Sequence, residues 1–268
     1  MTTLEAIILG IVEGVTEFLP VSSTGHMILA SYFMHIEDDP FTKLFEVCIQ
    51  LGAILSVVVL YWKKFFDFSK WQFYLKLVIA VIPALVLGFL FNDAIEDLLE
   101  SPLTVSVMLI LGGVVLLFID KAFKTPTITE EQEIKPKSAL WIGLWQCISM
   151  IPGVSRSAAT IIGGMQQKLT RSLAAEFSFF LAVPTMAAAT GYTLVLKHWN
   201  VNGVEMKGYE MLNNENLMVF GIGAFVSFVV AMIAIKTFIT FLQKHGFRVF
   251  GIYRIIAGLI MLLILGLK

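Results

Sequence analysis

Long apolar runs separated by short polar connections dominate this chain of 268 residues. A helix that crosses the hydrocarbon core of a bilayer needs about 17–25 predominantly apolar residues. Six runs satisfy that length, and each predicts a transmembrane helix. They cover approximately residues 45–62, 73–91, 103–119, 173–196, 217–238 and 250–267. The pattern therefore predicts an all-α integral membrane protein.

Two further apolar stretches, residues 4–30 and 139–164, are each broken near the middle. Pro20 interrupts the first stretch and Pro152-Gly153 interrupts the second. Proline ends or kinks a helix, so neither half of either stretch is long enough to cross a bilayer. Non-helical backbone at membrane depth is tolerated only where protein or a water-filled cavity surrounds it. Both stretches are therefore expected to form re-entrant helix–loop–helix hairpins.

The composition agrees with a membrane protein and excludes other classes. Hydrophobic residues make up 57% of the chain and charged residues 15%, against about 45–50% and about 25% in soluble domains. The net charge of -1 gives no reason to expect a nucleic-acid partner. Cys48 and Cys147 lie inside apolar stretches without the spacing of metal ligands, so both are expected to be packing residues.

The distribution of charge predicts an orientation in the membrane. Three connections are rich in basic residues, and the positive-inside rule places them in the cytoplasm. These residues are Lys63, Lys64, Lys70 and Lys76, then Lys121, Lys124, Lys135 and Lys137, then Lys236, Lys244, Arg248 and Arg254. Two of the alternate connections are acidic, with Glu37, Asp38 and Asp39 in one and Asp93, Glu96, Asp97 and Glu100 in the other. Both termini are then expected on the external face.

The chain also contains a weak internal repeat. A shift of 133 positions places Gly10 on Gly143 and Val21-Ser22 on Val154-Ser155. Each half would hold one broken segment and three spans, and because three is odd, the second half must be inverted in the membrane. Inverted repeats with broken helices are a known membrane architecture. We therefore expect one membrane domain over residues 1–268, with repeat one at 1–119, a cytoplasmic linker at 120–137 and repeat two at 138–268.

Two carboxylates precede the first break. Glu13 and Glu17 are four residues apart, so they share one face of a helix. Ionisable groups inside a membrane are costly and are usually functional. Two carboxylates together with phosphate oxygens are a common way to hold Mg²⁺. Glu13 and Glu17 are therefore candidate ligands of a divalent cation.

Hydroxyl groups and an imidazole follow the same break. Ser22, Ser23 and Thr24 come directly after Val21, where a new helix would begin and present unpaired backbone N–H groups. Such a helix terminus binds anions, phosphate in particular. His26 lies three residues beyond Ser23, within reach of it on a helix. The segment therefore has the groups needed for binding phosphate and for phosphoryl or proton transfer.

The second break contains a cation. Ser155, Arg156 and Ser157 follow Pro152-Gly153, again where a helix would begin. The planar guanidinium of arginine matches phosphate in a bidentate manner. An arginine at this depth should face the protein interior, where it would bind phosphate or, alternatively, form a structural ion pair with Glu17. Together the two halves would surround one anionic group.

The segments 13–26 and 152–157 resemble the undecaprenyl pyrophosphate phosphatases of bacteria, also called bacitracin-resistance proteins. Residues 45–47, 49–52 and 176–179 extend the similarity. The resemblance implies hydrolysis of undecaprenyl pyrophosphate to the monophosphate, which recycles the lipid carrier for cell-wall synthesis and confers bacitracin resistance. It also implies a divalent cation, Mg²⁺ or Ca²⁺. The implied location is the bacterial cytoplasmic (inner) membrane, with an active site that opens to the external, periplasmic face.

The same resemblance and the chemistry of the side chains suggest roles. Glu13 and Glu17 would hold the cation, and Arg156 would stabilise charge on the phosphate together with Ser22, Thr24, Ser155 and Ser157. Ser23 is the favoured nucleophile, with His26 as its base. Attack by His26 itself, through a phosphohistidine, and direct attack by water are the alternatives. Glu46, Gln50, Gln146 and Thr160 are candidates for supporting these groups.

A different class of function competes with the enzyme. The inverted repeat is typical of transporters, so a transporter or flippase of a polyprenyl phosphate or another anionic lipid is the alternative. Translocation requires only binding groups, whereas phosphoryl transfer requires a nucleophile or an acid–base pair such as Ser23 and His26. The sequence leaves the oligomeric state open, a homodimer included.

Overall fold

The fold is known from a computed structural model, which describes residues 1–99 and 101–266. Of the predicted acidic connection, Glu100 and the side chains of Asp93, Glu96 and Asp97 lie outside the described residues.

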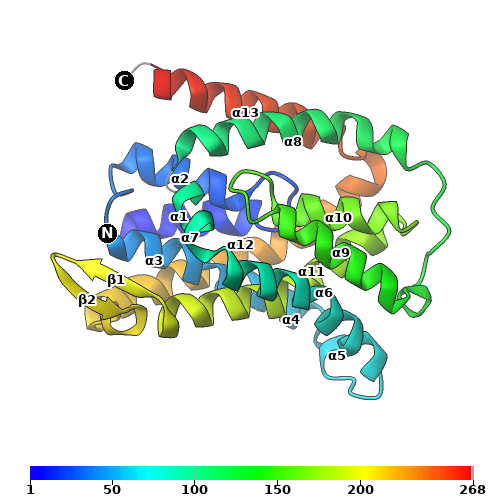
Figure 1. Ribbon diagram of the computed structural model, residues 1–268, viewed down its shortest axis with the longest axis horizontal. Helices are drawn as coiled ribbons and strands as arrows, with labels where there is room; N and C mark the ends of the chain where they lie inside the picture. The colour runs from blue at the N-terminus through cyan, green and yellow to red at the C-terminus, as the bar shows by residue number, and fades with distance from the viewer. Residues whose placement is uncertain (100, 267–268) are drawn as a thin grey trace.

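Helices account for most of the described chain (Figure 1). In chain order they are α1 (Thr3–Thr16), α2 (Ser23–Met34), α3 (Pro40–Cys48), α4 (Gln50–Leu60), α5 (Trp62–Phe65), α6 (Trp71–Leu90), α7 (Asn92–Leu99), α8 (Pro102–Ala122), α9 (Pro136–Ile148), α10 (Arg156–Gln166), α11 (Arg171–Gly191), α12 (Asn214–His245) and α13 (Arg248–Gly266). Two short strands, β1 (His198–Val201) and β2 (Val204–Lys207), pair antiparallel, with His198 opposite Lys207. The all-α prediction is confirmed.

Six helical segments in the described residues are long and apolar enough to cross a membrane. They are Pro40–Leu60, Trp71–Leu90, Pro102–Ala122, Arg171–Leu196, Asn214–His245 and Arg248–Gly266. Each contains most of one predicted span. The first starts earlier than predicted because the Asp39 side chain accepts from the N–H groups of Phe41 and Thr42 and caps the helix. The chain is therefore a multi-pass membrane protein.

The two broken segments form helix–loop–helix hairpins. The loop 17–22 separates α1 from α2, and the loop 149–155 separates α9 from α10. With 14 and 12 residues, α1 and α2 are about 21 Å and about 18 Å long, too short for a core of about 30 Å. The linker bonds to the far end of α10 through Thr127 N–H and Lys168 O at 2.9 Å. Since α9 begins directly after that linker, α10 returns to the end where α9 started. Entry of these hairpins into the membrane stays a prediction.

The two halves exchange their first helices. α1 packs against α12 of the second half, and α9 packs against α6 of the first half. The repeat-related glycines allow both approaches: a Cβ on Gly10 would lie 2.8 Å from Gly223 O, and one on Gly143 would lie 2.2 Å from Ala80 O. α8 and α13, the last helices of the two halves, pack against each other beside these pairs (Figure 1).

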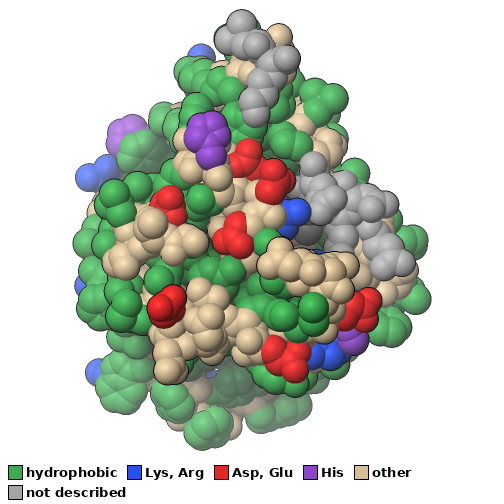
Figure 2. Space-filling model, turned by 90° about the vertical axis from the view of Figure 1, so that its left-hand side faces the viewer, with side chains coloured by type: hydrophobic (Ala, Val, Ile, Leu, Met, Phe, Trp, Pro, Cys, Tyr) green, Lys and Arg blue, Asp and Glu red, His purple; other side chains and the backbone are tan. Residues whose placement is uncertain are grey.

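The ends of the molecule differ in charge. α5, the linker and the connection between α12 and α13 lie at one end, whereas both termini and the β-hairpin lie at the other (Figure 1). Acidic side chains are spread over the end that carries the termini (Figure 2).

The assignment of Arg254 to a basic connection was wrong. Arg254 lies inside α13 with its side chain 0% exposed, because sequence position alone does not show which way a helical side chain points.

Candidate active site

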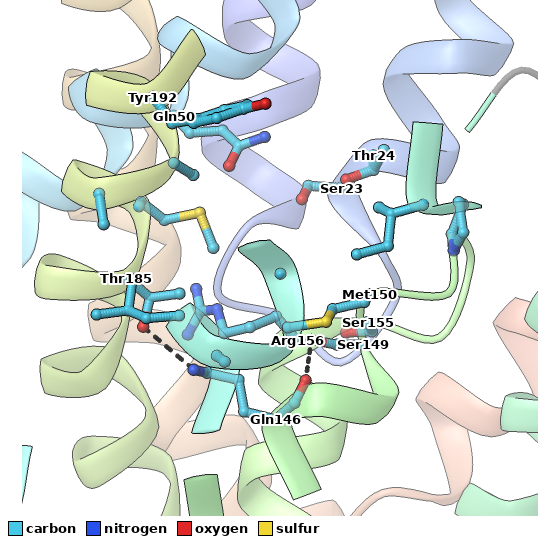
Figure 3. A pocket seen from close by; sticks show the side chains of 18 of the residues that line it. Ser23, Thr24, Gln50, Gln146, Ser149, Met150, Ser155, Arg156, Thr185 and Tyr192 are labelled. Carbon is cyan, nitrogen blue, oxygen red and sulfur yellow. Dashed lines mark hydrogen bonds between the residues drawn. The ribbon is translucent and has the colours of Figure 1, made fainter. Parts of the chain in front are cut away.

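A cavity of about 470 Å³ lies where the two broken segments meet. Its polar wall contains most of the site residues predicted from the sequence, and side chains from α2, α10 and α11 face one another around it (Figure 3). These predicted residues are Glu17, Ser22, Ser23, Thr24, Ser155 and Arg156. The first and second halves of the chain therefore form one site.

Glu17 is the central group of the polar wall. It is 5% exposed, and its two oxygen atoms have different partners. Oε1 accepts from Arg156 Nη2 at 2.6 Å, while Oε2 accepts from Ser23 Oγ at 2.6 Å. One carboxylate thus links the guanidinium of the second half to the hydroxyl of the first half. The ion pair considered for Arg156 is formed, and its binding of phosphate stays a prediction.

Arg156 is held in place on two sides. Besides the ion pair with Glu17, its Nη1 donates to the backbone oxygen of Ser178 at 2.9 Å and to Ser178 Oγ at 3.3 Å. Thr160 supports this arrangement because its hydroxyl donates to Ser178 Oγ at 2.6 Å. The Nε atom of Arg156 is buried without a hydrogen-bond partner among the described residues. One N–H donor of the guanidinium therefore has no acceptor among the described residues.

The two helices that begin at the cavity start in the same way. Ser22 and Ser155, which the repeat pairs, have φ angles of 72° and 77°. Each caps its helix, Ser22 Oγ accepting from Gly25 N–H at 3.4 Å and Ser155 Oγ accepting from Ala158 N–H at 3.2 Å. A positive φ is rare for a non-glycine residue and indicates a position that its surroundings impose. Both helix N-termini are thereby brought to one cavity, where their N–H groups favour negative charge.

Ser157 joins the loops and does not line the cavity. Its hydroxyl donates to Leu19 O at 2.7 Å. Ser155 Oγ lies 3.0 Å from Ser157 Oγ, and because the Ser157 proton points to Leu19, Ser155 is the donor in that pair. Here the Ser157 hydroxyl connects α10 to the loop after α1. Its predicted binding of phosphate stays a prediction.

His26 faces away from Ser23. Its Nδ1 donates to Ser22 O at 2.8 Å, and its Nε2 lies 2.7 Å from the hydroxyl of Tyr253, whose ring stacks on the imidazole. Burial lowers the pKa of His26 from its usual value near 6.5, so the neutral form is favoured, with Nε2 accepting from Tyr253. In the described structure the acceptor of the Ser23 proton is Glu17, and the expected hydrogen bond from Ser23 to His26 is not formed.

Glu13 is buried behind Glu17. It is 0% exposed, and both of its carboxylate oxygen atoms are buried without a hydrogen-bond partner among the described residues. Burial, with the Glu17 carboxylate nearby, raises its pKa well above the usual value. A buried carboxylate without partners is unfavourable, and a cation would relieve it. Within the described part of the chain, no group of three or more His, Cys, Asp or Glu residues forms a metal cluster, so such a cation would depend on one or two carboxylates and on substrate oxygens.

The chain matches the family described as bacitracin resistance protein BacA over residues 6–260. Proteins named undecaprenyl-diphosphatase are similar along nearly their whole length. One from Flavobacterium johnsoniae is 58% identical over 98% of this chain and 96% of its own length. One from Bdellovibrio bacteriovorus is 51% identical over 99% and 97%, and one from Aquifex aeolicus is 44% identical over 97% of each.

This chain belongs to the bacitracin resistance protein BacA family. The resemblance found in its motifs is thereby confirmed.

In this BacA family member, the cavity also contains residues to which the sequence analysis gave no direct role in binding or catalysis. Gln50 and Gln146 were named only as supporting candidates, yet both line the cavity, together with Thr185, Ser149 and Tyr192. Thr185 donates to Gln146 Oε1 at 3.3 Å (Figure 3). Tyr253, the partner of His26, lies 227 positions away in the sequence. In the sequence these are isolated polar residues on apolar helices. Such residues are equally expected to form helix–helix hydrogen bonds, so they did not indicate a site.

The contact between Glu17 and Arg156 should dominate the local stability. Replacing Arg156 by Met leaves a buried carboxylate uncompensated, so we expect a loss of about 3–5 kcal/mol. Adding Glu17→Gln should recover part of it, because the charge is then removed as well. Unfolding in mixed micelles by denaturing detergent measures both variants.

The matched control is Arg171→Met, because Arg171 pairs with Asp120 at 2.7 Å in a more exposed position. That change should cost about 0–1 kcal/mol. Losses from Glu17→Gln and Arg156→Met that simply add would contradict the coupling.

Proposed function

We propose that the protein hydrolyses undecaprenyl diphosphate to undecaprenyl phosphate and inorganic phosphate. The observation that carries the proposal is the contact of Glu17 with Ser23 and Arg156, the first residues of α2 and α10, an arrangement that suits a phosphoryl group. The relatives, named undecaprenyl-diphosphatase, support this activity over the transporter alternative. Recycling of the lipid carrier and resistance to bacitracin follow from the family.

The cavity has the two-part character that a lipid diphosphate requires. Its polar wall is formed by the residues around Glu17 and Arg156, while the rest is lined by apolar side chains that include Leu85 and Phe89 of α6 and Met186 of α11. Leu85 is 48% exposed and Phe89 is 80% exposed, so this side is open toward the surroundings of α6. The diphosphate would occupy the polar part, and the isoprenoid chain would leave past α6.

The side chains supply the groups for phosphoryl transfer. Ser23 is the nucleophile: its Oγ would bond to the terminal phosphorus as the anhydride bond breaks and the lipid phosphate leaves. Glu17 Oε2, which accepts a hydrogen bond from Ser23, would take the serine proton. Water would then release inorganic phosphate from the serine. Arg156, with its unpartnered Nε, binds the phosphate. The N-termini of α2 and α10 stabilise charge on the equatorial oxygens. His26 orients Ser22 through the backbone and stays an alternative nucleophile.

A divalent cation, Mg²⁺ or Ca²⁺, would be held by Glu13 and Glu17. The fit rests on the two unpartnered oxygen atoms of Glu13 directly behind the polar wall. When bound, such a cation would offset the negative charge of the diphosphate.

The first test is phosphate release from a C55 polyprenyl diphosphate by the purified protein. Ser23→Ala should lower turnover by at least about 10²–10⁴-fold, because the attacking oxygen is removed. Ser69→Ala, which changes an exposed loop hydroxyl, should leave turnover unchanged. Rapid quenching with labelled substrate identifies the attacking group: phosphate on serine supports the scheme.

Acid-labile phosphate on His26 would replace that scheme with the phosphohistidine route. An active Ser23→Ala variant without any covalent phosphate would leave water as the attacking group. No phosphate release from the parent protein would refute the proposed function.

The second test concerns the cation. Chelation should abolish turnover, and added Mg²⁺ or Ca²⁺ should restore it. The same cations should raise the Tm of the parent but not that of Glu13→Gln, because an amide binds a hard cation more weakly. Glu205→Gln, an exposed change on the β-hairpin, serves as the control. Full turnover in chelator would exclude the cation.

The third test concerns orientation. The cavity is lined by Asn92 and Ile95 of α7 and by Tyr192 at the end of α11. The termini lie at this end of the molecule (Figure 1), so the active site would open to the external face of the inner membrane. After Cys48 and Cys147 are replaced by alanine, Asn202→Cys should react with an impermeant maleimide in intact cells. Glu130→Cys should react only after permeabilisation, and the reverse result would invert the topology.

A further inference from the structure

Arg254 is a buried cation that the site described above does not use. It lies in the membrane-spanning helix α13, and its side chain is 0% exposed. Arg156 and Arg171 each pair with a carboxylate. Arg254 has no carboxylate at ion-pair distance among the described residues. An ionised group inside a membrane is costly and marks a function by default. The partners of Arg254 show what that function is.

The guanidinium of Arg254 donates all of its five N–H groups to backbone oxygens. Nε donates to Leu109 O at 3.4 Å, and Nη2 donates to Met108 O at 3.2 Å and to Gly153 O at 2.7 Å. Nη1 donates to Pro20 O at 3.2 Å and to Val154 O at 3.0 Å. An arginine has five such donors and no acceptor, so one side chain is fully satisfied by carbonyl groups from three segments.

Three of these five carbonyl groups come from the loops that precede α2 and α10. Pro20 belongs to the loop before α2, and Gly153 and Val154 belong to the loop before α10. A broken helix leaves backbone oxygens without helical partners, and inside a membrane no bulk water replaces those partners. Arg254 provides donors to both breaks at once and fixes both to α8, through Met108 and Leu109.

α8 is shaped to admit this side chain. A Cβ on Gly112 would lie 2.2 Å from Arg254 Nη2, and one on Gly113 would lie 3.1 Å from Arg254 Cβ. Gly112 therefore makes room for the guanidinium, and Gly113 allows α13 to approach α8 closely. The residue before it, Tyr253, bonds to His26, so one turn of α13 contacts α2 and both loops.

We infer that Arg254 is a positioning residue, which holds the N-termini of α2 and α10 at the spacing that the phosphate group requires. The expected effect of Arg254 on turnover rests on the proposed function. Its expected effect on the two loops does not. Lysine could not replace it. Its three N–H donors all belong to one nitrogen atom, so they cannot reach five carbonyl groups. Small misplacements of catalytic groups are costly, at about 10²-fold for 1 Å.

The experiment compares the parent protein with Arg254→Lys and with Gly112→Ala, which keeps the arginine but displaces its guanidinium. Hydrogen–deuterium exchange followed by mass spectrometry reports on the loops without any substrate. We expect exchange of amides in residues 17–25 and 149–158 to accelerate about tenfold or more, with α12 unchanged. In the turnover assay, kcat should fall about 10–100-fold, with a much smaller change in KM because the apolar part of the cavity is intact.

Two controls match these changes. Arg248→Lys alters an exposed arginine on the same helix, and Gly221→Ala adds a methyl group where nothing lies within 4 Å. Both controls should behave like the parent.

Loop exchange at the parent rate in both Arg254→Lys and Gly112→Ala would overturn the inference, whatever happens to turnover. Acceleration across the whole protein in both variants would also overturn it, because Arg254 would then support the fold in general. If Arg254→Lys fails to fold, Gly112→Ala decides between these results. A parent without turnover would refute the proposed function, and the exchange result would still decide the role of Arg254.

Discussion

This structure depends on one constraint. Two helices break inside an apolar protein, and the backbone polar groups at each break need hydrogen-bond partners. Where packed apolar side chains exclude water, other groups of the protein must supply the missing hydrogen-bond partners. Ser22 and Ser155 cap the new helices, and Ser157 donates to Leu19 O. Arg254 donates to the loop carbonyls of Pro20, Gly153 and Val154. The same arrangement that makes the breaks tolerable exposes two helix N-termini to one cavity, which is a suitable environment for an anionic group.

The two halves are similar in form and opposite in charge. Ser22 and Ser155 share a rare backbone conformation, and Gly10 and Gly143 allow the same close helix approach. Yet Glu17 occurs only in the first half and Arg156 only in the second, and they meet at 2.6 Å. In this pair each charge neutralises the other. A phosphate group would compete with Glu17 for Arg156, and a cation would compete with Arg156 for Glu17, so substrate and cation together would replace this contact.

The exchange of first helices explains why such a contact can form. α1 packs on α12, and α9 packs on α6, so each broken segment is surrounded by the other half of the chain. Glu17 and Arg156 are 139 positions apart in the sequence and reach one cavity only because of this exchange. Neither half could bury its own break alone, since a single short hairpin cannot enclose its loop.

The sequence by itself predicted the six spans, the two broken segments and most of the polar residues that line the cavity. The repeat and the binding of phosphate stay predictions. Apolar length, proline and glycine breaks and the clustering of polar residues are local properties, and Glu17, Ser23 and Arg156 lie within such clusters. Only the tertiary structure decided which groups touch. In the tertiary structure Ser23 donates a hydrogen bond to Glu17, and His26 bonds to Tyr253, because the direction of a side chain depends on what its helix packs against. The tertiary structure also moved Arg254 from a supposed basic connection to the interior, since its five partners come from segments that are distant in the chain and meet only after packing.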